Sequence, residues 1–186
     1  MPTRSAWEAK FSELQTKLLG DHHLIGQAIG VPFLLLLYPP GEEAAIRREA
    51  ATLAMVLRTR GIEVTEIDCA ILVLETIESR GELGRIIQAE RRDSNVLSEL
   101  GLGPVIADAL VARVRAAAGA MQKPCVVFLT RLAGVHPFAI PPMLQERMAG
   151  TVTIPVVFFV PAEPLDESHY LFMGSEKTLR YRGVYL

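Results

Sequence analysis

The chain has 186 residues, of which 50% are hydrophobic and 22% are charged, so it is long enough to bury a full core and too apolar to be disordered. Its formal net charge of -2 includes no basic or acidic block, which gives no support for a protein that wraps nucleic acid. We expect one globular domain spanning residues 1–186, without direct nucleic-acid binding.

The two cysteines, Cys69 and Cys125, lie in or beside apolar runs and form no CxxC pair, so neither a disulfide framework nor a zinc site is predicted. The N-terminal residues include no apolar segment typical of a signal peptide, and the longest apolar run, residues 31–38, is too short to cross a bilayer. A reduced protein of the cytoplasm, with no membrane association, is the expectation.

An amphipathic helix is predicted in residues 1–20, ahead of an α/β core at 31–186. Its apolar stripe recurs every three or four positions, at Trp7, Phe11, Leu14 and Leu18. If this helix does not cover the core, the stripe could mediate dimerisation or docking of a partner.

The elements expected next alternate between strand and helix. They are a buried strand at 32–38, a helix at 42–61, a half-exposed edge strand at 62–68, helices at 69–81, 82–92, 93–100 and 103–121, a buried strand at 124–130, a helix from Pro141, a buried strand at 154–160, and shorter strands at 169–173 and 180–186. Because parallel neighbours need crossover helices, this order predicts a three-layer α/β sandwich with a mostly parallel central sheet of about five strands.

Sheets of this class bind ligands beyond the carboxyl ends of their strands, so the loops at 38–43, 68–69, 131–142 and 161–169 are the candidates for function. The first of them has the strand–turn–helix order of a phosphate-binding loop but lacks its lysine and its Ser/Thr. Pro39 and Pro40 have no N–H to donate.

Glu42 and Glu43 place negative charge where a bound anion would lie. We therefore predict a turn that starts a helix, with an ion pair from Glu43 to Arg47 four residues on. No GxGxxG fingerprint follows either strand, and no GxSxG nucleophile motif is present.

Metal binding is the next possibility. His22 and His23 are adjacent and would point in different directions on a regular element. Five other side chains could converge at the sheet edge: Asp68, His136, Glu163, Asp166 and His169. Their wide separation in sequence favours caps and solvated loop residues instead, so we predict no metal and no cofactor; a metal-dependent hydrolase using Asp68, His136 and Glu163 remains a third hypothesis.

The segment 130–142 leaves a buried strand with Arg131, His136 and a dense set of prolines, which make it stiff. In the structural interpretation Phe138 and Ile140 close the end of the sheet. In the functional interpretation the segment is a preformed loop for protein interaction.

Several segments give the chain a family resemblance: "CVVFLTRLAGVHPF", "LQERM", "IPVVFFVPAE" and the terminal "YRGVYL". With these segments the chain resembles the BrxB family, the B component of the BREX phage-resistance systems, over nearly its whole length. It departs from the family pattern at 160–163, where "VPAE" replaces a "YPGE"-like turn, and near the end, where only Tyr181 and Arg182 remain of a doubled tyrosine before arginine. Alanine at 162 lacks the freedom of glycine, so a different turn is expected there.

The resemblance implies a role in bacterial defence against phage, beside an adenine methyltransferase, a large ATPase and the alkaline-phosphatase-like protein PglZ. It implies an accessory or adaptor subunit rather than an enzyme, with PglZ as the expected partner and a homo-oligomer possible. The candidate interaction residues are Arg131, His136, Phe138, Glu163, Arg180, Tyr181 and Arg182. The alternative is a degenerate NTPase-like α/β domain that binds nucleotide or nucleic acid weakly.

Overall fold

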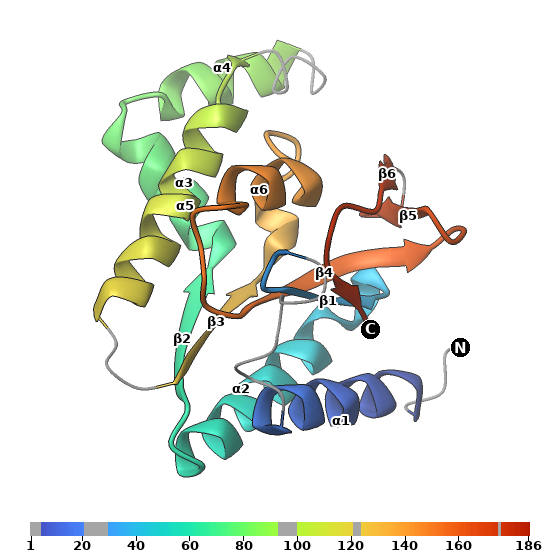
Figure 1. Ribbon diagram of the computed structural model, residues 1–186. Helices are drawn as coiled ribbons and strands as arrows, with labels where there is room; N and C mark the ends of the chain where they lie inside the picture. Colours follow the sequence, from blue (N-terminus) through green and yellow to red (C-terminus); the bar gives the residue numbers. More distant parts are fainter. Residues whose placement is uncertain (1–4, 21–29, 93–99, 121–123, 175) are drawn as a thin grey trace.

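The apolar runs of the sequence form the middle of a parallel sheet in the computed structural model (Figure 1). The structure describes residues 5–20, 30–92, 100–120, 124–174 and 176–186. His22, His23 and most of the helix expected at 93–100 lie outside these ranges.

The sheet has the strand order β2-β3-β4-β1-β7, and every pairing along this path is parallel. These strands are β1 (Phe33–Tyr38), β2 (Glu63–Asp68), β3 (Cys125–Thr130), β4 (Val156–Pro164) and β7 (Val184–Tyr185). Two more strands, β5 (His169–Phe172) and β6 (Glu176–Leu179), extend from β4 in antiparallel order. The predicted sheet of about five mostly parallel strands is confirmed.

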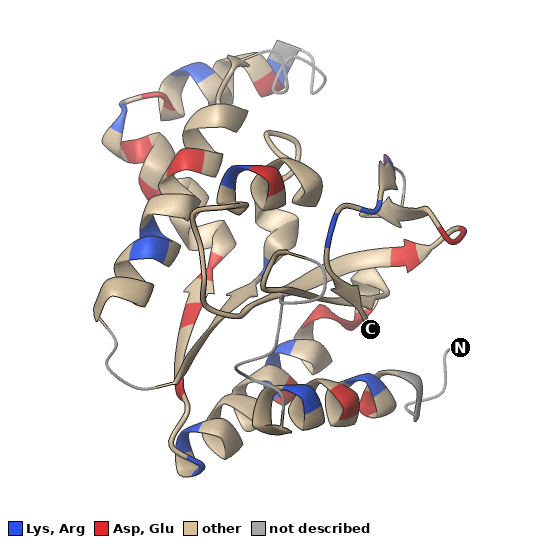
Figure 2. Ribbon diagram, in the orientation of Figure 1, with Lys and Arg blue, Asp and Glu red and all other residues tan. Residues whose placement is uncertain are grey.

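Helices cover both faces of the sheet (Figure 1). They are α1 (Ser5–Gly20), α2 (Glu43–Thr59), α3 (Cys69–Ser79), α4 (Leu83–Arg92), α5 (Gly103–Ala120) and α6 (Pro141–Met148), with short 3-10 turns η2 (Pro40–Glu42) and η4 (Leu132–Val135). One apolar core lies between the sheet and α1 with α2, and a second between the sheet and α3, α5 and α6. Charges of both signs are spread over the outer surfaces of these helices (Figure 2).

Burial explains the strand pattern. Every residue of β1 and β3 is buried, as are the first seven of β4, which accounts for the unbroken apolar runs. In β2, Val64 enters the core under α2 and Ile67 enters the core under α3, while Glu63 and Glu66 are exposed. This strand ends the sheet, as its mixed pattern predicted.

The N-terminal helix α1 lies on the sheet. Leu14 and Leu18 are fully buried, and the Phe11 ring stacks on Phe159 of β4 with 5.9 Å between centroids. Lys10 Nζ donates a hydrogen bond to the Leu37 carbonyl at 2.7 Å, and burial lowers its pKa. The apolar stripe therefore belongs to the core and is not a free docking face.

Two boundaries differ from the prediction. Strand β4 continues to Pro164, and Ala162 is buried within it, opposite Phe172 of β5, so this position is extended strand and not a turn. The terminal strand expected at 180–186 shortens to Val184–Tyr185, and β6 was not predicted because its four residues show no apolar run.

Replacing Leu14 tests whether α1 is part of the core. We expect Leu14→Ala to lower the free energy of unfolding by about 2–5 kcal/mol, because a fully buried leucine loses its contacts and leaves a cavity. Urea denaturation measures the change. The exposed Ser12→Ala on the same helix is the control and should change stability by less than about 0.5 kcal/mol. Equal effects of the two substitutions would contradict the docking of α1.

Candidate functional site

The loop after β1 is closed by the chain's own groups. The Tyr38 hydroxyl donates a hydrogen bond to the Glu43 carboxylate, and the Glu42 N–H donates to the Pro39 carbonyl at 2.9 Å. Burial, together with the bond to Glu43, raises the pKa of Tyr38. No ion pair joins Glu43 to Arg47, both of which the structure describes, so that predicted pair is wrong: Glu43 turns to the tyrosine instead.

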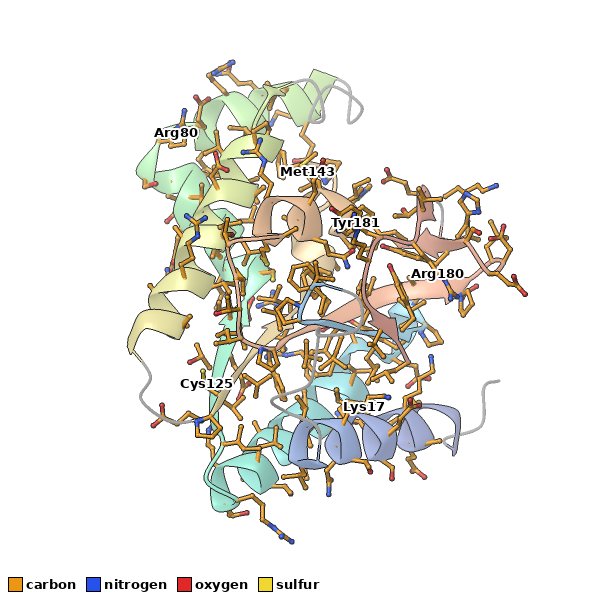
Figure 3. All side chains as sticks on the ribbon, in the orientation of Figure 1. Lys17, Arg80, Cys125, Met143, Arg180 and Tyr181 are labelled. Carbon is orange, nitrogen blue, oxygen red and sulfur yellow. The ribbon has the colours of Figure 1, made fainter. Side chains whose placement is uncertain are left out.

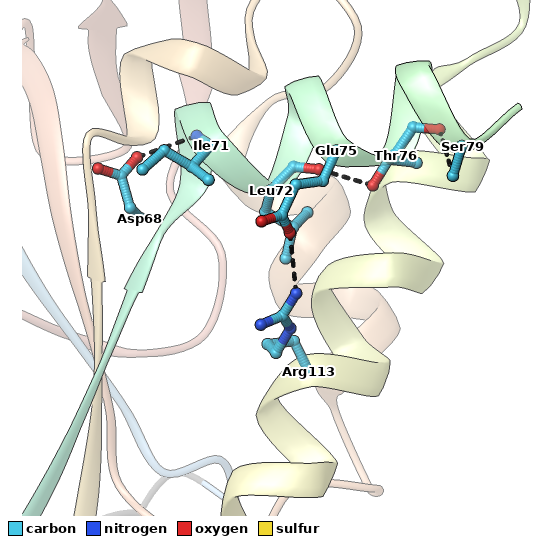
Figure 4. A network of polar contacts seen from close by, with 7 residues as sticks. All are labelled: Asp68, Ile71, Leu72, Glu75, Thr76, Ser79 and Arg113. Atoms are coloured by element: carbon cyan, nitrogen blue, oxygen red, sulfur yellow. Dashed lines mark hydrogen bonds and ion pairs between the residues drawn. The ribbon is translucent and has the colours of Figure 1, made fainter. Parts of the chain in front are cut away.

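Asp68 joins the ends of β2 and β3. Its Oδ1 accepts the Ile71 N–H at 3.0 Å, which caps α3 (Figure 4), and its Oδ2 accepts a hydrogen bond from Arg131 Nη1 at 3.0 Å. Arg131 has left-handed backbone angles, φ 51° and ψ 42°, so the chain turns sharply as it leaves β3. The charges of Asp68 and Arg131 are thus paired with each other, and Asp68 also caps the start of α3.

Beside Asp68, an open groove of about 480 Å³ lies between α2 and the carboxyl ends of β2 and β3. Its lining residues are Ala44, Arg47, Arg48, Ala51, Glu66, Asp68 and Thr130. Arg47 and Arg48 are exposed, and their guanidinium groups pair with no side chain in the described part of the chain. This groove therefore offers two uncommitted positive charges.

A smaller groove, about 140 Å³, lies on the other face of β2, between this strand, α3 and α5. Its lining residues are Thr65, Glu66, Ile67, Asp68, Ile71, Leu72, Glu75 and Arg113. Arg113 Nη2 donates to Glu75 Oε2 at 3.0 Å across it (Figure 4). Ile71, which lines the groove, is 50% exposed, and Leu74 in the next turn of α3 is 48% exposed. The groove thus has an exposed apolar side chain at Ile71.

The proline-rich segment follows the structural interpretation. Phe138 and Ile140 pack against the core under α3, α5 and α6. His136 lies beside the β5–β6 hairpin, with Nδ1 3.6 Å from Glu176 Oε2 and its ring edge-on to Phe172 at 6.0 Å. This part of the loop anchors the hairpin to the body of the protein.

The C-terminal candidates hold the tail in place (Figure 3). The Arg180 guanidinium lies 5.0 Å from the centre of the Tyr185 ring, and the Tyr181 N–H donates to the Tyr185 hydroxyl at 2.9 Å. The fully buried Gln145 donates from Nε2 to the Arg182 carbonyl at 3.0 Å. The Arg182 side chain itself is exposed, so of these arginines it is the one open to a partner.

Glycine at 183 suits a close contact between the tail and β1. A Cβ at Gly183 would lie 2.5 Å from Leu35 Cδ1 and 3.4 Å from Gln145 Nε2, so a larger residue would push the end of the Leu35 side chain aside. The "RG" of the terminal motif is therefore favoured by packing.

The five residues considered for a metal are separated into four places. Asp68 pairs with Arg131, His136 lies by Glu176, and Asp166 binds His169 at 2.9 Å, which lowers the Asp166 pKa. Glu163 is exposed on β4, opposite Leu171. Within the described ranges no group of three His, Cys, Asp or Glu side chains could hold a metal ion, so the hydrolase hypothesis has no assembled site.

Both cysteines are buried and not disulfide-bonded, and burial raises the pKa of each thiol. Their sequence context predicted this core position. The sequence did not predict the two grooves beside β2, because a groove depends on how α2, α3 and α5 pack on the sheet. The one pattern that could have indicated the first groove was the pair Arg47 and Arg48 on the polar side of an amphipathic helix.

No protein-family model matches this chain, and no match was found among curated proteins or solved structures. The resemblance to the BrxB family therefore remains a prediction from the motifs quoted above. Among the described residues, no helix is both long and apolar enough to cross a membrane.

Substitution of Asp68 separates its two contacts. Asparagine caps helices as well as aspartate but cannot form the ion pair with Arg131, whose side chain is 39% exposed. We expect Asp68→Ala to lower the free energy of unfolding by about 1–2 kcal/mol and Asp68→Asn by less than about 1 kcal/mol. Thermal or urea unfolding measures both, and an Asp68→Asn variant as unstable as Asp68→Ala would show that the ion pair dominates.

Proposed function

We propose that the chain is a non-catalytic protein-binding subunit that acts as an adaptor in the cytoplasm. One observation carries the proposal: apolar side chains are exposed on two consecutive helices, the first of which begins where the edge strand β2 ends. They are Ile71 and Leu74 on α3, and Leu83 and Ile87 on α4, with exposed fractions between 38% and 50%. Exposed apolar side chains grouped in this way are typical of a surface that a partner covers.

The polar groups at the carboxyl end of the sheet support the same proposal. Tyr38 is bonded to Glu43, and Asp68 is bonded to Arg131 and to the start of α3, so the polar groups of these side chains are used within the chain. Neither pair has the arrangement of a nucleophile with its base. The chemistry available at this edge is recognition.

The resemblance to the BrxB family identifies the setting that we propose: a BREX phage-resistance complex, with a PglZ-type protein as partner. Of the candidate interaction residues, Arg182 and Glu163 are exposed, but they lie near β7 and at the end of β4, away from the apolar side chains of α3 and α4 (Figure 1). Phe138, Arg180 and Tyr181 fix the proline-rich loop and the tail.

Co-expression with the neighbouring PglZ tests this function. We expect the two proteins to co-elute in sizing chromatography, and the double substitution Ile71→Asp with Leu74→Asp to abolish co-elution, because it places charge in an apolar contact. Met55→Asp is the matched control, since Met55 is 59% exposed on α2, on the opposite face of the sheet. If both proteins are soluble and no complex forms, the adaptor function with PglZ as partner is contradicted.

A second candidate function is weak binding of a nucleotide or nucleic acid, and the groove with Arg47 and Arg48 is the observation that favours it. The prolines before α2 and the glutamates at its start oppose it. We expect millimolar ATP, or duplex DNA, to change the melting temperature by less than about 1 °C. A larger shift that disappears in the Arg47→Ala, Arg48→Ala variant would favour the second candidate instead.

A further inference from the structure

The outer edge of β2 is an unpaired strand edge. In the described chain β2 pairs with β3 alone, and it is the last strand on that side of the sheet (Figure 1). The Glu63 N–H donates to the Pro124 carbonyl at 2.8 Å, on the β3 side. Because hydrogen-bonding direction alternates along a parallel strand, Val64 and Glu66 direct their N–H and C=O groups outward.

The Arg58 side chain covers the Val64 carbonyl on this edge. Arg58 Nη2 donates to the Val64 carbonyl at 2.8 Å and lies 3.4 Å from Glu66 Oε1. The Arg58 side chain is 48% exposed, so it can leave the carbonyl at small cost when another donor arrives. A charged side chain over an edge carbonyl is a common protection of sheet edges against unspecific pairing.

The two grooves lie on the two faces of this edge, and Glu66 lines both. On the α2 face the groove offers Arg47 and Arg48, whose charges are uncommitted within the described chain. On the α3 face it offers the aliphatic side chain of Ile71. A strand laid along β2 would direct its side chains alternately into these grooves.

We propose that β2 accepts an extended segment of a partner protein as an added strand, with acidic side chains toward Arg47 and Arg48 and aliphatic side chains toward Ile71. This inference rests on the proposed function as a protein-binding subunit and specifies how the partner is held. Backbone hydrogen bonds at Val64 and Glu66 supply affinity, and the two unlike grooves supply specificity.

Self-pairing is opposed by charge. Antiparallel pairing of β2 with a second copy, centred on the outward-facing Glu66, would place Glu66 opposite Glu66, and like charges in direct cross-strand contact are unfavourable. We therefore favour a different partner as the source of the acidic strand.

A synthetic peptide tests the inference directly. The probe is a fluorescein-labelled peptide of about ten residues in which valine alternates with glutamate, titrated with the full chain by fluorescence anisotropy. We expect this alternating peptide to bind. A peptide of the same composition with the alternation scrambled should bind at least about tenfold more weakly. A peptide with lysine in place of glutamate should also bind at least about tenfold more weakly.

Two substitutions of Glu66 separate the contribution of its backbone N–H to peptide binding from that of its side chain. Glu66→Pro removes an outward N–H without breaking the ladder to β3, and we expect it to weaken binding at least about tenfold. Glu66→Thr keeps the N–H and a residue suited to strands, so binding should stay within about twofold. Far-UV circular dichroism and melting temperature check that both variants fold.

The arginine groove has its own variant, which does not depend on the proline substitution. Arg47→Ala with Arg48→Ala changes only exposed side chains, and we expect about a tenfold loss for the glutamate peptide and little change for the scrambled one. The inference is overturned if the alternating peptide does not bind, if it binds no better than the scrambled one, or if folded Glu66→Pro binds it as the unchanged chain does.

Failure of this inference is distinguishable from failure of the proposed function. If the chain co-elutes with PglZ and Glu66→Pro co-elutes equally well, the adaptor function stands and strand addition is wrong. If the peptide binds at β2 but PglZ does not co-elute, strand addition stands and the proposed partner is wrong.

Discussion

Two-sided burial of the parallel strands is the constraint on which the rest of the structure depends. Strands β1, β3 and β4 have no exposed face along their shared length, so helices must cover both sides, and α1 is needed to finish the cover under β4. Once both faces are occupied, the sheet itself can make new contacts only at its ends and edges. At the carboxyl end, Tyr38, Asp68 and Arg131 are bonded within the chain, and an open groove remains beside them. The outer edge of β2 adjoins this groove.

The layers and their order could be predicted from sequence because each depends on local patterns. The unbroken run of β1 indicated burial on both faces, and the mixed pattern of β2 placed it at the edge. Side-chain partners were less predictable, because they depend on distances between segments far apart in the chain. Glu43 fits an ion pair with Arg47 by spacing, yet the Tyr38 hydroxyl lies closer, in a buried position where a partner is worth more.

The candidate interaction residues divide into those used within the chain and those left exposed. They were chosen because their residue types suit interfaces, and the sequence alone does not show which side chains are already bonded within the fold. Arg180 and Tyr181 are used within the chain to seat the tail on Tyr185, and Phe138 packs in the core. Arg47 and Arg48 were not candidates, although in the described chain they line a groove and pair with no side chain. Availability, and not residue type, distinguishes a binding side chain from a structural one.

The packing of α1 on the sheet also affects how the chain folds during synthesis. Phe11 is synthesised long before its stacking partner Phe159, and β1 likewise awaits β4. Until then α1 and β1 have α2 as native cover but lack the strand between β1 and β3, and such delay favours association with chaperones or with neighbouring chains. Correct folding of α1 and β1 therefore depends on a strand far along the chain, and a variant in which β4 cannot form would expose both.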